Sequence, residues 1–221
     1  MKTIAVSILI IGVLTSGSFG AVTIDRVNVN PQRTTALAQF NTTGDDMAGM
    51  QLRVNGTDTA TWAITGAEAG GATGTGWSLT ETGDTGLADW TLSSSIGMQT
   101  LFIDAGPGDT VFDTIPGVVD TPGSEVGIPF ELQDSGGFDG DIRVTYTGPV
   151  RLTGAAFAGD LYRFMRVEFT TPFTGTLTFR ADTDNAAVRG DIIPVIPAPG
   201  ALVLASLGSA VWVWIRRRAG A

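Results

Sequence analysis

Carboxylate side chains are the residues of this chain whose type and spacing could support chemistry. The densest group lies in residues 134–141, where Asp134, Asp139 and Asp141 are separated by serine, glycine and phenylalanine. Closely spaced carboxylates beside glycine can surround a hard cation such as calcium with oxygen ligands. The spacing differs from that of an EF-hand loop, and aspartate and glycine are also the usual residues of turns. We therefore favour a turn, keep calcium as the alternative, and interpret the sparser acidic segments 104–113 and 182–184 in the same way.

Glycoside hydrolysis is the enzymatic reaction that carboxylates alone can support. It requires two carboxyl groups about 5–10 Å apart in a cleft. No spacing in the sequence singles out such a pair, so we do not expect an enzyme, and a glycosidase is the least favoured alternative. The candidate carboxylates for that alternative are Glu68, Glu81, Glu125, Glu131 and Glu168.

Three tryptophans, Trp62, Trp77 and Trp90, could form a flat platform that stacks on sugar rings. Large aromatic side chains also supply much of the buried area of β domains. We favour the core interpretation. An exposed row of these tryptophans on one sheet face would instead favour a carbohydrate-binding module.

The composition excludes several other mechanisms. The chain has no histidine and no cysteine, and its only lysine is Lys2. Ser-His-Asp and Cys-His catalysis therefore lack their base, zinc sites lack their usual ligands, and Schiff-base and P-loop chemistry lack their lysine. Between the apolar ends of the chain, nine basic against 22 acidic residues give a net charge of −13. Such a surface repels nucleic acid, so we expect no nucleic-acid partner.

The residues that carry these groups are organised as short strands. Apolar and polar residues alternate in 128–133, 141–146 and 176–181, which indicates strands with one buried face. Turn residues separate such segments at intervals of roughly 8–12 residues, as is typical of a β-sandwich or jelly roll. We expect residues 21–189 to form one all-β domain, with 66–86 either a long loop or a pair of edge strands. The other predicted strands are 22–29, 35–40, 50–54, 61–64, 76–80, 90–92, 100–104 and 161–170.

The first 20 residues have the pattern of a secretory signal peptide. Lys2 is followed by an uncharged apolar run and then by small residues. Ser18 and Gly20 suit the small-residue positions before a cleavage site, which we expect after Gly20 or, failing that, after Ala21. An uncleaved anchor is the less favoured alternative, because small residues follow the apolar run directly.

The last 28 residues, 194–221, combine a proline-containing edge, an apolar run and a basic end. A helix over 200–215 would be about 24 Å long, against a hydrocarbon core of about 30 Å, so it is a short transmembrane candidate. Arg216, Arg217 and Arg218 resist translocation and should remain cytoplasmic in residues 216–221. A buried C-terminal helix would explain the apolar run but not these arginines. Residues 190–199 are the expected linker to the membrane.

This tail resembles the PEP-CTERM sorting signal, the tag of exosortase substrates in Gram-negative-type bacteria. Pro197 and Pro199 match the two prolines of the motif, Gly200 leads into the helix, and the arginines match the basic end. Ala198 stands where the family usually has glutamate. The resemblance is confined to the tail, and it implies recognition by an integral-membrane exosortase that removes the tail.

Together these features predict an exported structural or interaction protein. It would begin as a precursor anchored in the inner membrane and end at the cell surface or outside the cell. Its expected partners are the membrane, an exosortase-type enzyme and an exopolysaccharide of an extracellular matrix. We expect no cofactor unless the calcium alternative holds. A carbohydrate-binding module on the same anchor is the alternative function.

Overall fold

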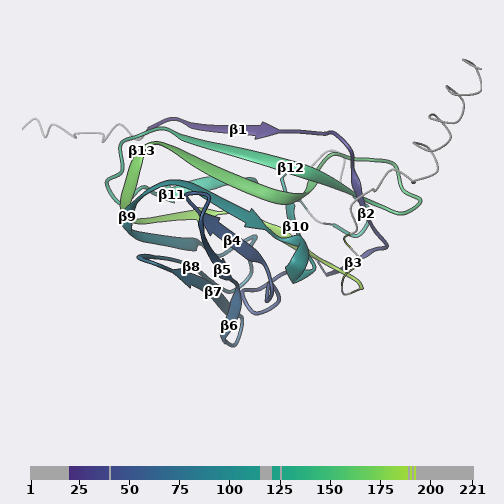
Figure 1. Cartoon of the computed structure of the whole chain (residues 1–221). Coiled ribbons are helices and arrows are strands. Elements are labelled where there is room, and N and C mark those ends of the chain that lie inside the picture. Colours follow the sequence, from purple (N-terminus) through teal and green to yellow (C-terminus); the bar gives the residue numbers. More distant parts are fainter. Residues whose placement is uncertain are drawn as a thin grey trace, which may run out of the picture.

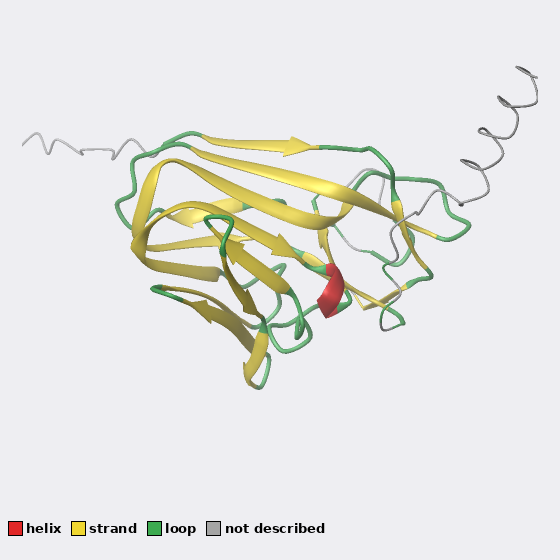
Figure 2. Ribbon diagram, viewed as in Figure 1, coloured by secondary structure: helices red, strands yellow, loops and turns green. Residues whose placement is uncertain are grey.

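The computed structural model describes residues 20–192 except 40, 115–120, 125, 189 and 191. These residues form an all-β domain, as the sequence predicts, with fourteen strands and one turn of 3-10 helix, Gly106–Gly108 (η1). Figure 2 shows how strands and loops account for the described chain. The strands are β1 (Val22–Arg26), β2 (Gln32–Thr34), β3 (Leu37–Gln39), β4 (Gln51–Val54), β5 (Asp58–Thr61), β6 (Ala63–Gly66), β7 (Ala69–Gly74), β8 (Trp77–Thr82), β9 (Trp90–Asp104), β10 (Thr110–Asp113), β11 (Glu131–Asp134), β12 (Ile142–Leu152), β13 (Leu161–Arg180) and β14 (Thr183–Ala186).

Both ends of the chain lie outside this description. The predicted signal peptide before Gly20, the Pro-x-Pro motif, the apolar helix and the basic tail all fall on residues that the structure does not describe. Within the described residues, no helix has the length and apolar character needed to cross a membrane.

The strands form one large, mostly antiparallel sheet built around β9 and β13. The main strand order is β3-β14-β10-β13-β9-β8-β7-β6, and β11 and β12 also pair with β13 while β4 pairs with β9. The pairings of β12 with β1 and with β2 are parallel. The register of β9 and β13 shifts around Phe173, as at a β-bulge, and bulges bend the strands that contain them. Figure 1 shows both long strands turning at the left of the view, beside the labels β9 and β13. As a result β1 and β12 lie along the top and β7 and β8 along the bottom.

One hydrophobic core lies beneath this bent sheet. Alternate residues of β4, β8, β9, β12 and β13 point into it, because successive side chains of a strand face opposite sides. Its centre is aromatic: Trp90 lies 5.2 Å from Trp62 and 5.9 Å from Phe179 between ring centroids, and Phe130 stacks on Phe179 at 4.6 Å. A smaller cluster of Val111, Val150, Leu161, Ala186 and Ile192 lies near β10 and β14.

Several strand predictions need correction. The separate strands predicted at 90–92 and 100–104 are one strand, β9, and those at 161–170 and 176–181 are one strand, β13. Only the second half of 128–133 is a strand, because Pro129 lacks a backbone N–H and Phe130 donates its N–H to the Tyr146 hydroxyl. Segment 66–86 contains the paired strands β7 and β8 rather than a long loop, but these are not edge strands, because β6 pairs with β7 and ends the sheet.

The bend should be sensitive to its aromatic filling. Phe173 is fully buried there, stacked on Phe169 at 5.0 Å and edge-on to Phe138 at 5.7 Å. We expect Phe173→Ala to lower the free energy of unfolding by about 3–5 kcal/mol, since it removes the contacts of a buried ring with its neighbours and leaves a cavity. Phe157→Ala, at a ring that is 36% exposed, is the matched control and should cost less than about 1 kcal/mol. Urea denaturation followed by tryptophan fluorescence measures both; equal losses would contradict this account of the bend.

Candidate functional site

The acidic loop 134–141 forms local turn contacts. The Asp134 carboxylate accepts a hydrogen bond of 2.8 Å from the Gly136 N–H, as in an Asx turn. The Asp141 carboxylate accepts one of 2.8 Å from the Ala21 N–H, and the Asp139 side chain is exposed. Gly136 and Gly137 have φ of 57° and 87°, where glycine is the least strained residue. These contacts agree with the favoured turn interpretation and bring no three of the loop's carboxylates together.

The glutamates considered for hydrolysis come from separate elements. Glu68 and Glu131 are exposed, and Glu168 pairs with Arg166 at 2.9 Å. Glu125 lies outside the described residues. Only Glu81 is buried, on β8, and neither of its carboxylate oxygens has a hydrogen-bond partner in the described structure. Burial therefore sets Glu81 apart from the other described candidates.

The three tryptophans are core residues, which confirms the favoured prediction. Trp62, Trp77 and Trp90 are all buried. Each indole N–H has an acceptor, respectively the Gly44 carbonyl, the Asp58 carboxylate and the Ala181 carbonyl. They therefore present no exposed row of rings on which a sugar could stack.

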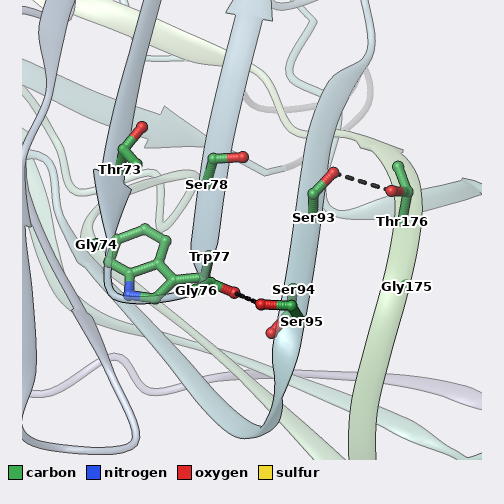
Figure 3. A pocket seen from close by; sticks show the side chains of 10 residues that line it. All are labelled: Thr73, Gly74, Gly76, Trp77, Ser78, Ser93, Ser94, Ser95, Gly175 and Thr176. Carbon is green, nitrogen blue, oxygen red and sulfur yellow. Dashed lines mark hydrogen bonds between the residues drawn. The ribbon is translucent and has the colours of Figure 1, made fainter.

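A shallow groove of about 490 Å³ lies on the outer face of the sheet. Figure 3 shows hydroxyl groups from four neighbouring strands across it, those of Thr73, Ser78, Ser93 and Thr176. The four residues are partners in register across β7, β8, β9 and β13, and the Ser93 and Thr176 hydroxyls are 2.9 Å apart. No charged side chain lines the groove, so it could hydrogen-bond a neutral polar ligand but could not supply acid–base catalysis.

The unexpected site is a cluster of buried aspartates. Asp113 ends β10, Asp182 directly precedes β14, and Asp184 is the second residue of β14, the strand that pairs with β10. The Asp113 N–H donates to the Asp182 carbonyl at 3.0 Å, which places these two acids across from each other. Each of the three residues supplies a carboxylate oxygen such that all three atoms lie within 4.8 Å of one another. Only 1%, 5% and 1% of the respective residues is exposed.

Hydroxyl groups and backbone pack closely around the cluster. The Ser124 hydroxyl lies 2.6 Å from Asp113 Oδ2 and 2.7 Å from Asp184 Oδ2. Asp182 Oδ1 accepts hydrogen bonds from the Thr85 hydroxyl and the Thr183 N–H. Gly127 covers the Asp113 carboxylate so closely that a Cβ there would lie 2.1 Å from Oδ1, so only glycine fits.

Burial and mutual repulsion disfavour the charged forms of these acids. Burial is the main cause that raises the pKa of Asp182 to about 7, and the nearby Asp113 charge adds to it. Burial likewise raises the pKa of Asp184 to about 8, against the opposing effect of the Ser124 hydrogen bond. Glu81 is a separate case with its pKa raised to about 8, again mainly by burial and then by Asp84 and Asp45. Near neutral pH the cluster must therefore hold protons or bind a positive charge.

The sequence named these acids only within the segments 104–113 and 182–184, where it favoured turns and kept calcium as the alternative. The pairing of β10 with β14 that joins the two segments is not visible in either one. A local signal did exist, since Asp182 and Asp184 alternate with Thr183 between alanines at 181 and 186, as in a strand rather than a turn.

Comparisons of the chain with protein-family models, with curated proteins and with solved structures found no match. The assignment of a role therefore depends on the residues and their geometry.

The raised pKa values of Glu81, Asp182 and Asp184 predict an unusual pH dependence of stability when divalent cations are removed with EDTA. In the unfolded chain the carboxyl pKa values are about 4, so these groups lose their protons above about pH 4. In the folded chain Glu81, Asp182 and Asp184 keep their protons until the pH reaches their raised pKa values of about 7 to 8. The stability from these groups is complete below about pH 4 and is lost as the pH rises toward 8, by up to about 1.4 kcal/mol per pH unit for each extra proton.

Thermal unfolding in EDTA between about pH 5.5 and about pH 7.5 tests this prediction. The melting temperature should fall across the range, and Glu81→Gln should make the fall shallower because it removes one of the three protons. A melting temperature that rises with pH would show that these acids are ionised in the folded chain.

Proposed function

We propose that the chain is an exported, surface-sorted structural or interaction protein, and that the acidic β domain is the part delivered. The observation that carries this proposal is the division of the chain into two apolar ends and an acidic centre. The described centre has a hydrophobic core of its own. We further propose that the domain is of the β-sandwich class, which the bent sheet with its enclosed core supports.

A contact at the start of the domain supports cleavage after Gly20. The Ala21 nitrogen donates to Asp141 Oδ1 at 2.8 Å, and the Ala21 carbonyl accepts from the Ile142 N–H at 2.9 Å. After the cut this nitrogen would be the N-terminal ammonium group, already beside a carboxylate. Because the contact is exposed, the charge pair would add little stability, but it would hold the new terminus on the sheet.

The sorting tail supplies the mechanism of the proposal. The apolar helix would stop in the membrane with Arg216, Arg217 and Arg218 on the cytoplasmic side, and residues 197–200 would form the recognition edge for an exosortase. No residue of the domain is assigned a catalytic role, and an exopolysaccharide remains the proposed partner outside the cell.

A chain with one epitope tag inside the domain and another after Ala221 tests this sorting. We expect the domain tag at the cell surface or in the medium without the distal tag, and only when an exosortase is present. Replacing Pro197 and Pro199 together by alanine should leave both tags on one membrane-bound species. Replacing Pro122 and Pro129, which lie within the domain, is the matched control. A single full-length species in the soluble cytoplasm would contradict the proposal.

Carbohydrate binding is the second candidate function, and the hydroxyl-lined groove of Figure 3 is the observation that favours it. A row of neutral hydroxyl groups in a shallow groove suits the hydroxyl groups of a polysaccharide. Replacing Ser78 and Ser93 by valine would remove two hydroxyls at half-buried positions of the row. Under this candidate function, pull-down on insoluble polysaccharides should fall at least about tenfold, the equivalent of about 1.4 kcal/mol. Unchanged retention would leave the groove without a role in binding.

A further inference from the structure

We propose that Asp113, Asp182 and Asp184 form a calcium site that ties β10, β14 and the loop bearing Ser124 together. This site goes beyond the proposed function, which assigns the domain no cofactor. It also differs from the acidic loop 134–141 that the sequence pointed to, since among the described residues only these three acids bring ligand atoms within 4.8 Å of one another.

The first reason is that two of the three acids, Asp182 and Asp184, have no balancing cationic side chain among the described residues. Asp182 and Asp184 take part in no ion pair within the described residues. The arginines whose ion pairs the structure describes are paired elsewhere: Arg143, Arg163, Arg166 and Arg180. Buried carboxylates normally need an opposite charge, a metal ion or a proton, and the described ion pairs supply no opposite charge to Asp182 or Asp184.

The second reason is an orphaned oxygen. Asp184 Oδ1 is buried and has no hydrogen-bond partner in the described structure, on a residue that is only 1% exposed. Leaving a buried acceptor of this kind unsatisfied is costly, and a cation would satisfy it directly.

The Ser124 hydroxyl adds a third reason. It is within hydrogen-bond distance of both Asp113 Oδ2 and Asp184 Oδ2, yet it has one hydrogen to donate. One of the two short oxygen–oxygen contacts therefore needs another positive group, either a proton on a carboxyl or a cation shared between them.

Protons and a cation are thus competitors for the same space. At low pH, protonated carboxyl groups relieve the repulsion by themselves, and a carboxyl group must lose its proton to act as a metal ligand. At higher pH those protons are lost, and a divalent cation can replace them. Binding should therefore strengthen as the pH rises and should release protons to the solvent.

The donor set favours calcium among divalent cations. All the available ligands are oxygens, which excludes a preference for soft metals. One carboxylate oxygen from each of the three aspartates and the adjacent Ser124 hydroxyl give four oxygen donors, and bidentate binding by the carboxylates would add to them toward the six to eight that calcium takes. Magnesium usually keeps several bound waters, and the close packing by Gly127 leaves little room for them.

Calorimetric titration of the purified full-length chain, kept in mild detergent and stripped with EDTA, tests the site. At about pH 8 we expect calcium to bind with proton release and to raise the melting temperature by about 5–10 °C at 100 times the dissociation constant. At about pH 5.5 the rise should be smaller, because protons compete for the same carboxylates, and magnesium should act at least about tenfold more weakly. No calcium binding up to about 10 mM at pH 8 overturns the proposal, because extracellular calcium modules bind below that level.

Asp184→Asn distinguishes a metal site from ordinary burial, because it should have opposite effects on stability without calcium and on calcium binding. In EDTA at about pH 8 the variant should melt at the same temperature as the wild type or higher, since it removes a buried negative charge. Its affinity for calcium should be at least about tenfold lower than that of the wild type. Asp139→Asn, in the exposed acidic loop, is the matched control and should bind calcium as the wild type does. Calcium binding that survives Asp184→Asn, or that is lost in Asp139→Asn, would move the site away from the cluster.

Discussion

The antiparallel pairing of β9 with β13 is the interaction on which the rest of the fold depends. The register runs from Phe164 opposite Asp104 at one end to Phe179 opposite Trp90 at the other. Strands β4 and β8 add to β9, whereas β10, β11 and β12 add to β13, so this one pair places the strands that enclose the core. At one end the Arg163 guanidinium makes two hydrogen bonds, of 2.6 and 2.8 Å, to the Asp104 carboxylate. In the middle, the shift of register near Phe173 bends both strands and turns their apolar faces toward each other.

The sequence predicted much of this sheet piece by piece, because alternation of apolar and polar residues is a local property. It located β4 and the first half of β12, and it identified the core tryptophans. It also found both halves of β9 and of β13. It could not join those halves, because Ser93 to Gly97 and Pro172 to Gly175 have the residue types of turns. The structure uses such residues at bulges inside continuous strands, where the register of a distant partner decides the outcome.

The candidate site shows a different limit of the sequence. Aspartate marks turns in most of this chain, and loop 134–141 follows that rule through its Asp134 to Gly136 contact. Asp113, Asp182 and Asp184 look the same in sequence but are covered by other parts of the chain, among them Gly127 and Ser124. Burial changes their chemistry by raising the pKa of Asp182 and Asp184, and burial depends on contacts between residues more than 50 positions apart. No spacing rule applied to one segment can detect that change.

The proposed calcium site and the proposed export route support each other physically. The chain has no cysteine, so disulfides cannot stabilise it outside the cell as they do many secreted domains. Near neutral pH and without calcium, Asp182 and Asp184 oppose folding, because burial raises their pKa values to about 7 and about 8 and disfavours their charged forms. In a compartment rich in calcium the same side chains become ligands, and the free energy of binding adds to that of folding. The cluster would then do for this domain what a disulfide does for others, and it would act only after export.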